Sequence, residues 1–280
     1  MTSSQSHPCR SKLADERELI PTILMPHKFA PRHFYHLAEP ANWPSIRRYG
    51  LLSTERLLDL AKVPENEREA ILFQHRPKSI VLANGAIIRD QKPMPPPLIA
   101  RALPKDVPPS AWYRFLNRFV FLWSNRARVE RHLRAFGARP QILLAFDASQ
   151  LLEQLGDRIY LSPINSGNAR RRPVRRSIHL FVPYREWIES GWRAIDGESR
   201  RRSCAPAEIL VEGSLTLEPF LVAACMVRHG SAAVLRRNRF FLIEAERSSR
   251  SFEAAVVTTS GCPNASIRPT ANSVYYLSST

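Results

Sequence analysis

The stretch that decides the fold reads FYHL at residues 34–37, followed by NWPSIRRYGLLS at residues 42–53. The first four residues are apolar apart from one histidine, which is typical of a short strand that carries one polar side chain. The second run has helical spacing and ends at Ser53, which can cap a further helix. A strand that presents a lone histidine before a helix can hold the ribose end of a nucleotide, so His36 is a candidate site residue. A buried histidine bonded to a backbone carbonyl is the plainer alternative.

The composition of the 280-residue chain is typical of a globular protein with a full core, since 44% of its residues are hydrophobic and 9% are aromatic. Its polar first ten residues contain no secretory signal, and its apolar runs are too short to span a bilayer. We therefore expect a cytoplasmic protein without a membrane partner. The four cysteines are scattered and form no CxxC pair, so we expect no metal site.

The chain is strongly basic, with a net charge of +16 and a pI of about 10.5, and 35 of its 41 basic residues are arginine. Guanidinium groups make paired hydrogen bonds to phosphate oxygens, so this excess favours a nucleic-acid partner. A GC-rich genome that writes arginine for lysine would give the same excess. The composition leaves the oligomeric state open.

The sequence predicts that the chain is divided into three segments. Residues 1–30 are rich in serine, proline and charge, which predicts a flexible arm, and residues 247–280 are rich in serine, threonine, alanine and asparagine, which predicts a disordered tail. Residues 31–246 form one predicted domain. Short strands alternate irregularly with short helices there, which favours an α+β fold over a doubly wound sheet.

The predicted helices share an apolar spacing near 3.6 residues and comprise residues 43–49, 55–61, 68–76, 110–118, 126–136, 148–155 and 219–227. The predicted strands are short apolar runs and comprise residues 79–82, 86–88, 119–123, 141–146, 159–161, 177–183 and 208–211. The proline-rich residues 93–97 are expected to form a rigid spacer.

Two candidate residues lie at the ends of predicted strands. Arg89 comes directly after residues 86–88, where its guanidinium can clamp a pyrophosphate, although a solvated surface ion pair is the alternative. Trp123 ends the strand at residues 119–123 beside polar residues, so its indole can stack on a nicotinamide or a base. Core packing is the alternative for this tryptophan.

A polar loop and an arginine run lie next to each other. The loop, SPINSGN at residues 162–168, contains Asn165 and offers small polar side chains and backbone N–H groups. The run predicts a phosphate-binding patch that contacts nucleic acid and comprises Arg170, Arg171, Arg172, Arg175 and Arg176. A charged surface loop with no ligand is the alternative.

Glu208 opens the strand predicted at residues 208–211. One carboxylate placed against a ribosyl C1′ can stabilise an oxocarbenium-like charge and polarise a 2′-hydroxyl. An edge-strand glutamate that faces water is the alternative. Glu212 lies on the same face of the strand, further along.

An early histidine, an aromatic residue on a middle strand and a glutamate at the start of a late strand resemble the His–aromatic–Glu pattern of the ADP-ribosyltransferase superfamily. The runs YHL, NWPSI and GL within residues 35–51 are similar to the opening of DarT-like DNA ADP-ribosyltransferases. The run AEILV at residues 207–211 is similar to the sequence around their catalytic glutamate. Residues 33–225 also resemble an uncharacterised bacterial domain family of unknown function that is related to this fold.

The resemblance implies a split central β-sheet with flanking helices and an NAD-dependent ADP-ribosyltransferase activity, with NAD as the substrate. By position, Glu208 and His36 would be catalytic, and His36 would contact the nicotinamide ribose. Arg89 would orient the NAD. The remaining residues of the implied NAD site are Trp123, Asn165 and Ser53.

Two other functions stay open at this point. A non-catalytic basic protein on the same fold would bind nucleic acid or a nucleotide, with an affinity that falls steeply with salt. An RNA-processing enzyme that uses NAD as a phosphate acceptor would need arginine and histidine side chains around one phosphate. The sequence leaves the acceptor of an ADP-ribosyl group undecided, although the arginines favour nucleic acid.

Overall fold

The computed structural model describes residues 29–170, 175–192 and 205–229. All of them belong to one of the two compact units into which the chain divides, residues 1–243. The predicted tail lies outside the described residues, and so does the predicted arm except for its last two residues.

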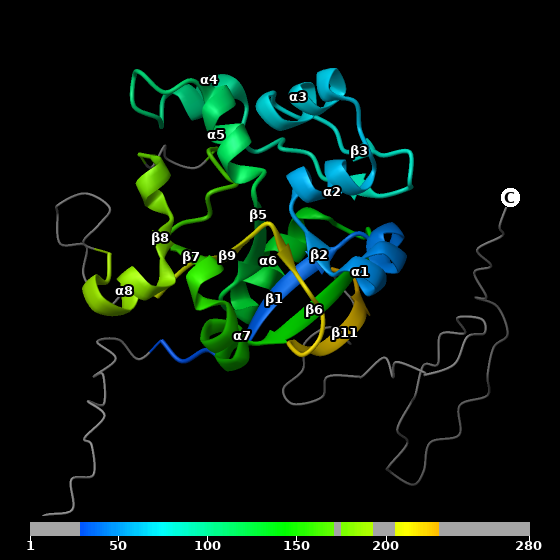
Figure 1. Cartoon of the computed structure of the whole chain (residues 1–280), viewed down its shortest axis with the longest axis vertical. Helices are drawn as coiled ribbons and strands as arrows, with labels where there is room; N and C mark the ends of the chain where they lie inside the picture. Colours follow the sequence, from blue (N-terminus) through cyan, green and yellow to red (C-terminus); the bar gives the residue numbers. More distant parts are fainter. Residues whose placement is uncertain (1–28, 171–174, 193–204, 230–280) are drawn as a thin grey trace, which may run out of the picture. The chain divides into compact units, whose positions relative to one another are not determined.

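A seven-stranded antiparallel sheet is the centre of the described fold (Figure 1). The strand order is β11-β6-β1-β5-β9-β7-β8. These strands are β1 (His33–Ala38), β5 (Phe119–Trp123), β6 (Gln141–Asp147), β7 (Ile159–Ser162), β8 (Val182–Pro183), β9 (Glu208–Glu212) and β11 (Leu221–Val227). The predicted α+β class is confirmed.

Two short ribbons accompany this sheet: β10 (Ser214–Leu215) pairs with β2 (Leu51–Leu52), and β3 (Ile80–Val81) pairs with β4 (Ile87–Ile88). The described residues form eight α-helices, which are α1 (Trp43–Tyr49), α2 (Thr54–Leu60), α3 (Glu65–Phe73), α4 (Pro96–Ala100), α5 (Pro109–Leu116), α6 (Arg126–Ala135), α7 (Ala148–Leu155) and α8 (Tyr184–Ser190). None of these helices is both long and apolar enough to cross a bilayer.

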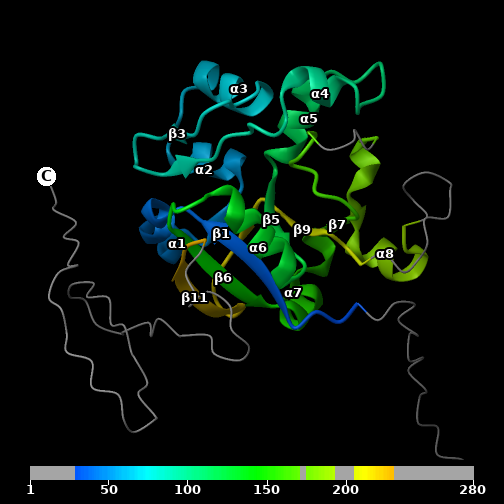
Figure 2. The ribbon, with the colours of Figure 1, turned by 180° about the vertical axis from the view of Figure 1, so that it is seen from behind.

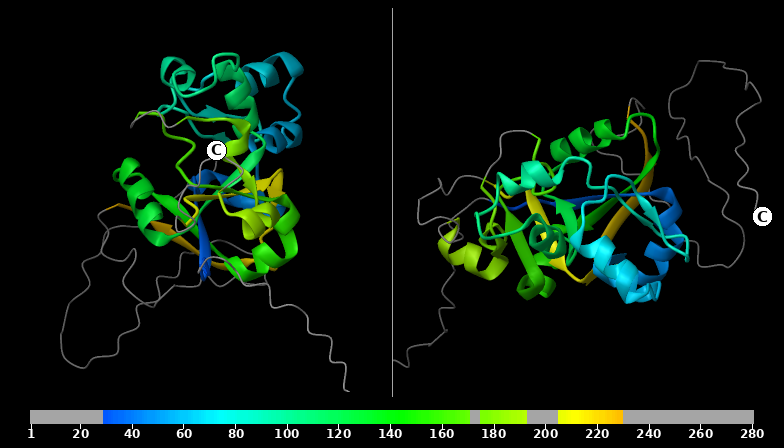
Figure 3. Two further views of the ribbon diagram at one scale, coloured as in Figure 1. Left: turned by 90° about the vertical axis from the view of Figure 1, so that its left-hand side faces the viewer. Right: turned by 90° about the horizontal axis from the view of Figure 1, so that it is seen from above.

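Strand alternation gives the sheet two covered faces. The face that carries Leu122 and Ile209 packs against α7 and α8. The opposite face carries Tyr35, which packs against α6, and Leu210, which packs against α5. These helices can be followed in the front and back views of Figures 1 and 2. Helices α2 to α5, which connect β2 to β5, gather together, as the cyan-to-teal segment in Figure 3 shows.

The two halves of the sheet are joined through a short contact between β1 and β5. In the described strands this contact is a single residue pair, Tyr35 with Trp123. By contrast, β1 pairs with β6 over six residues and β5 pairs with β9 over five. The backbone ladder is therefore weakest between β11-β6-β1 and β5-β9-β7-β8.

Several predicted elements need correction. Residues 219–227 were expected to be helical but contain strand β11, because pairing with β6 outweighs the weak helical preference of LVAACMV. Residues 177–183 were expected to be one strand but divide into a 3₁₀ turn at Ile178–Leu180 and the two-residue β8. The expected proline spacer runs into α4, because proline is tolerated in a first helical turn.

Candidate functional site

Glu208 is a buried acid on an inner strand. Because β9 lies between β5 and β7, Glu208 pairs with Trp123 on one side and with Ser162 on the other. Glu208 is only 4% exposed to solvent. The alternative of an edge-strand glutamate that faces water is therefore wrong.

Two hydrogen bonds from Ser166 hold the Glu208 carboxyl group. The Oε2 atom accepts one from the backbone N–H at 3.0 Å and one from the hydroxyl at 2.6 Å. Burial raises the pKa of Glu208 to about 7, because desolvation outweighs these hydrogen bonds and the positive charges of Arg128 and Arg176. Near neutral pH both forms of the carboxyl group are populated, which suits a group that must gain or lose a proton.

The polar loop at residues 162–168 lies at this acid, since Ser166 belongs to it. Asn165 is the residue before Ser166 and is partly exposed, so the structure brings the predicted Asn165 to the neighbourhood of Glu208. Ser166 and Arg128 also lie close to the acid but were not predicted as site residues from the sequence. Ser166 belongs to the loop at residues 162–168, but it lies 42 residues from Glu208 in the sequence, and no local sequence pattern indicates a contact over that separation.

Trp123 stands beside Glu208 on the adjacent strand and on the same face of the sheet. Its Nε1–H donates a hydrogen bond of 3.0 Å to Nδ1 of His132 in α6. Burial, together with the charges of Arg89 and His36, lowers the pKa of His132 to about 3, so the imidazole is neutral and able to accept. Trp123 is partly exposed, so an orientated indole borders the acid. His132 could not be predicted from the sequence, because a histidine in a basic helix looks the same there whether it is buried or exposed to solvent.

His36 lies at the junction of β1 and β5. Its Nδ1 is 2.9 Å from the carbonyl oxygen of Phe121, which can only accept, so Nδ1 carries the proton and Nε2 carries a lone pair. Burial lowers the pKa of His36 to about 4, although the Phe121 bond opposes this and Arg89 adds to it. The alternative given in the sequence analysis, a buried histidine bonded to a backbone carbonyl, is confirmed for Nδ1.

Strand register relates His36 to Glu208. Tyr35, Trp123 and Glu208 form one row across β1, β5 and β9, so His36 stands two strands from Glu208 and one residue beyond the row. The usual strand spacing then separates their Cα atoms by about 10 Å. Alternation directs the two side chains to opposite faces of the sheet. His36 and Glu208 lie at the same end of the sheet, on opposite sides of the single-pair contact between β1 and β5.

Arg89 is not brought to Glu208. Its Nε donates to Oε1 of Glu39 at 3.1 Å, a second nitrogen donates to the Gln141 side chain, and its guanidinium carbon lies 4.6 Å from the centre of the Phe136 ring. Glu39 comes directly after β1, and Gln141 is the first residue of β6. Because β1 and β6 are antiparallel, both residues lie at the same end of these strands, away from the row that contains Tyr35, Trp123 and Glu208. The side chain is engaged in a largely buried ion pair rather than directed at the acid.

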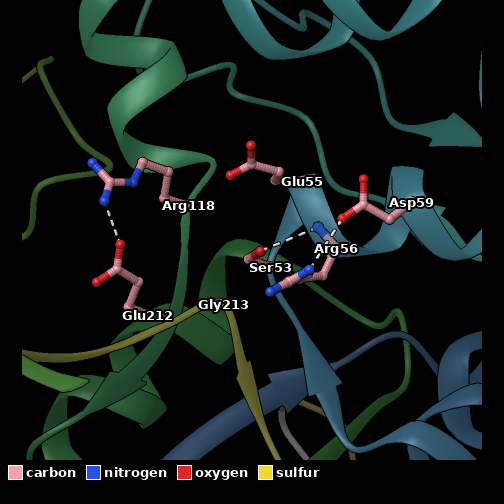
Figure 4. Close-up of a pocket in the computed structure, with 7 residues that line it drawn as sticks. All are labelled: Ser53, Glu55, Arg56, Asp59, Arg118, Glu212 and Gly213. Atoms are coloured by element: carbon pink, nitrogen blue, oxygen red, sulfur yellow. Dashed lines mark hydrogen bonds and ion pairs between the residues drawn. The ribbon is translucent and has the colours of Figure 1, made fainter. Parts of the chain in front are cut away.

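Ser53 is also placed elsewhere, in a cavity of about 270 Å³ at the far end of β9 (Figure 4). Its hydroxyl accepts a hydrogen bond of 3.3 Å from the backbone N–H of Arg56 and caps α2. The cavity walls carry paired charges, such as Arg118 with Glu212 and Arg56 with Asp59. The geometry of Ser53 is that of a helix cap.

The predicted arginine patch is divided. Arg171 and Arg172 lie outside the described residues, whereas Arg170 and Arg175 are exposed. Arg176 is only 2% exposed, and it donates a hydrogen bond of 2.8 Å to the Asn168 carbonyl. It therefore belongs to the surroundings of the buried acid rather than to a surface patch. Among the described residues, no group of three histidine, cysteine, aspartate or glutamate side chains gathers as a metal site.

A family model described as "Family of unknown function (DUF7002)" matches residues 32–218, which is well over half of the chain. The match begins just before β1 and ends after β10, so it includes the β1–β5 junction and the whole of β9. No curated protein and no solved structure matches the chain.

Proposed function

The chain belongs to the DUF7002 family of unknown function, and we propose that it is an NAD-dependent ADP-ribosyltransferase-like enzyme. The observation that carries this proposal is Glu208, an inner-strand carboxyl group with a pKa raised to about 7 beside the partly exposed Trp123. The resemblance of its sequence to DarT-like enzymes adds support.

The proposed chemistry begins with the bond between the nicotinamide nitrogen and the ribose C1′ of NAD. This bond breaks with its electron pair leaving on nicotinamide, and positive charge develops on C1′. An ionised Glu208 would stabilise that charge. The nicotinamide of NAD is itself a cation, so its binding would lower the pKa of Glu208 and favour the carboxylate.

The acceptor would then attack C1′ with an electron pair and lose a proton. A carboxylate with a pKa of about 7 can take that proton at neutral pH. The net charge of +16 and the exposed Arg170 and Arg175 favour nucleic acid as the acceptor. The proposal does not specify whether a base or a phosphate of the nucleic acid accepts the ADP-ribosyl group.

Two aromatic side chains take distinct roles. Trp123, orientated by His132, would stack on the nicotinamide ring. His36 would accept a hydrogen bond from a ribose hydroxyl at Nε2, because its Nδ1–H is already donated to Phe121. A ligand that meets both His36 and Glu208 would have to enter at the single-pair junction of β1 and β5.

The phosphates of NAD would face Arg128 and the loop that contains Asn165. Arg128 is half-buried in α6 and interacts electrostatically with Glu208, so it lies on the same side of the sheet. Arg89 and Ser53 stay outside this arrangement, because Arg89 is bound to Glu39 and Ser53 caps a helix.

The test is release of nicotinamide from NAD, measured with and without DNA, RNA and cell lysate. Glu208→Gln keeps the side-chain shape and an oxygen acceptor for Ser166 but removes the charge, so we expect release to fall at least about 100-fold. Glu212→Gln on the same strand is the matched control and should keep wild-type turnover. Circular dichroism and thermal unfolding establish that both variants fold.

Absence of nicotinamide release under every condition would overturn the proposal. In that case, nucleic-acid binding that falls steeply with salt and is unchanged in Glu208→Gln would support the basic binding protein instead. The exposed Arg170 and Arg175 are the observation that favours this second function.

A further inference from the structure

Helix α6 begins at the end of the sheet where the buried acid lies. It follows β5 after two residues, and the last residue of β5, Trp123, pairs with Glu208. Arg128, which is half-buried in the first turn of α6, interacts electrostatically with both Glu208 and Arg131. Positive charge therefore continues from the surroundings of the acid onto the outer surface of this helix.

Three exposed arginines lie along the rest of this segment, Arg131 and Arg134 on α6 and Arg139 shortly after it. Side chains three residues apart are neighbours on a helix surface, so Arg131 and Arg134 lie side by side. Glu130 is the one acidic residue between positions 126 and 139, and it already pairs with Arg126 at 3.1 Å. In the part of the chain that the structure describes, no carboxylate pairs with Arg131 or Arg134.

The positive charge is concentrated on this segment and is not spread evenly over the helices. Residues 126–139 contain five arginines and one glutamate, which gives a net charge of +4. By contrast, α3 contains three glutamates and one arginine, and α7 contains one glutamate and no basic residue. A GC-rich genome would favour arginine on every exposed helix, so it does not account for this difference.

The exposed guanidinium groups are suited to a chain of phosphates, because each can make paired hydrogen bonds to phosphate oxygens. The ten residues of α6 extend over about 15 Å, which several consecutive phosphates of a nucleic acid can follow. An anionic membrane is the other common polyanion, but a helix that binds a membrane inserts its apolar face. The apolar side chains of α6, Val129 and Leu133, are already packed against the sheet, so charge complementarity favours nucleic acid.

We propose that Arg131, Arg134 and Arg139 form a docking surface for the phosphate backbone of a nucleic acid that reaches Glu208 along α6. The guanidinium of Arg139 is held 3.2 Å from the carboxylate of Glu39 but remains exposed, so it is already orientated on the surface. The inference rests on the proposed function for the role of the docked strand as acceptor. The docking itself requires no NAD.

The test is the fluorescence anisotropy of labelled single-stranded DNA and RNA of about 20 nucleotides, measured without NAD over a range of salt concentrations. The α6 double variant, Arg131→Ala with Arg134→Ala, removes two phosphate contacts. Each contact on a single strand contributes about 0.7 to the slope of log K against log salt, so the slope should fall by about 1.4 and the affinity at about 0.1 M salt by about 20-fold. Alanine is a good helix former, so the variant should fold, and circular dichroism verifies this.

The α1 double variant, Arg47→Ala with Arg48→Ala, is the matched control. Both arginines are exposed on a helix that packs against the other face of the sheet, and their loss changes the net charge by the same amount. Distant charges are screened at about 0.1 M salt, so the affinity should fall by no more than about twofold. Arg131→Lys with Arg134→Lys keeps the charge on α6 and should keep the wild-type salt slope.

Equal losses of affinity in the α6 and α1 double variants would overturn the docking surface. Wild-type affinity in the α6 double variant would overturn it as well, and so would binding of phosphatidylserine vesicles in place of both oligonucleotides. Nicotinamide release separates this inference from the proposed enzyme. Absence of release together with a selective loss of binding in the α6 double variant would refute the enzyme and support the docking surface, and release with unchanged binding in that variant would do the reverse.

Discussion

Ser166 donates both its backbone N–H and its hydroxyl to the same oxygen of Glu208, at 3.0 and 2.6 Å. Both bonds favour the ionised carboxylate, whereas burial favours the protonated acid. The resulting pKa of about 7 reflects the balance between these two effects. Changing either effect should move the pKa in a known direction.

Ser166→Ala removes the hydroxyl bond and leaves the backbone bond in place. A hydrogen bond to a charged group contributes about 1.5–3 kcal/mol, so the pKa of Glu208 should rise by roughly one unit or more. The side-chain carboxyl signal of Glu208, followed by ¹³C NMR during a pH titration, measures this shift. Ser162→Ala is the control because Ser162 bonds to Ile164 rather than to the acid. An unchanged or lower pKa in Ser166→Ala would contradict the assignment.

The raised pKa of Glu208 also predicts a pH-dependent stability. Because the folded state holds the proton more tightly than the unfolded chain, stability is highest below the ordinary value of 4.5 and is lost as pH rises toward about 7. A difference of this size corresponds to a loss of roughly 3 kcal/mol. Glu208→Gln, which cannot ionise, should therefore gain stability relative to the wild type between pH 4.5 and pH 7.5. Urea unfolding at the two pH values measures the difference, and a pH-independent difference would argue against a buried ionisable acid.

His132→Leu should leave the indole N–H of Trp123 without its acceptor. The expected cost is about 1–3 kcal/mol of unfolding free energy, together with an upfield shift of the Trp123 indole proton. His132→Gln supplies an amide oxygen and should lose less. Equal stability of the leucine and glutamine variants, with an unmoved indole signal, would show that the 3.0 Å bond does not orientate Trp123.

Arg89 offers a direct contrast between a structural and an NAD-binding role. Arg89→Met breaks its pair with the buried Glu39, while Arg139, at 3.2 Å, still contacts that carboxylate. We expect a loss of about 2 kcal/mol in unfolding free energy, with nicotinamide release per folded molecule within about twofold of the wild type. Arg170→Ala, on the surface, should change stability by less than about 0.5 kcal/mol. A large rise in the KM for NAD in a stable Arg89→Met protein would instead support the NAD-orienting role that the resemblance implies.

Local patterns in the sequence were sufficient for part of this structure. The apolar runs around Phe121 and Ile209 predicted the strands β5 and β9, and the position of Glu208 at the start of β9 followed from its place before that run. The predicted helices at residues 126–136 and 148–155 match α6 and α7 closely, because their apolar spacing and caps are local signals.

Contacts between distant residues were beyond that approach. The sequence suggested a phosphate clamp at Arg89, but its side chain pairs with Glu39, 50 residues earlier, and with Gln141, 52 residues later. The burial of Arg176 follows from the three-dimensional position of its loop, whereas the arginine run by itself indicated a surface patch. Strand β11 was missed since its partner β6 lies about 80 residues away.

The pH dependence of nicotinamide release tests the role of Glu208 most directly. The free enzyme needs the carboxylate to stabilise charge at C1′, so kcat/KM should rise with pH and level off with an apparent pKa near 7. In Ser166→Ala the same midpoint should move to higher pH. A profile that is flat between pH 5 and pH 8.5, or one that Ser166→Ala leaves in place, would contradict the assignment of Glu208 as the catalytic carboxylate.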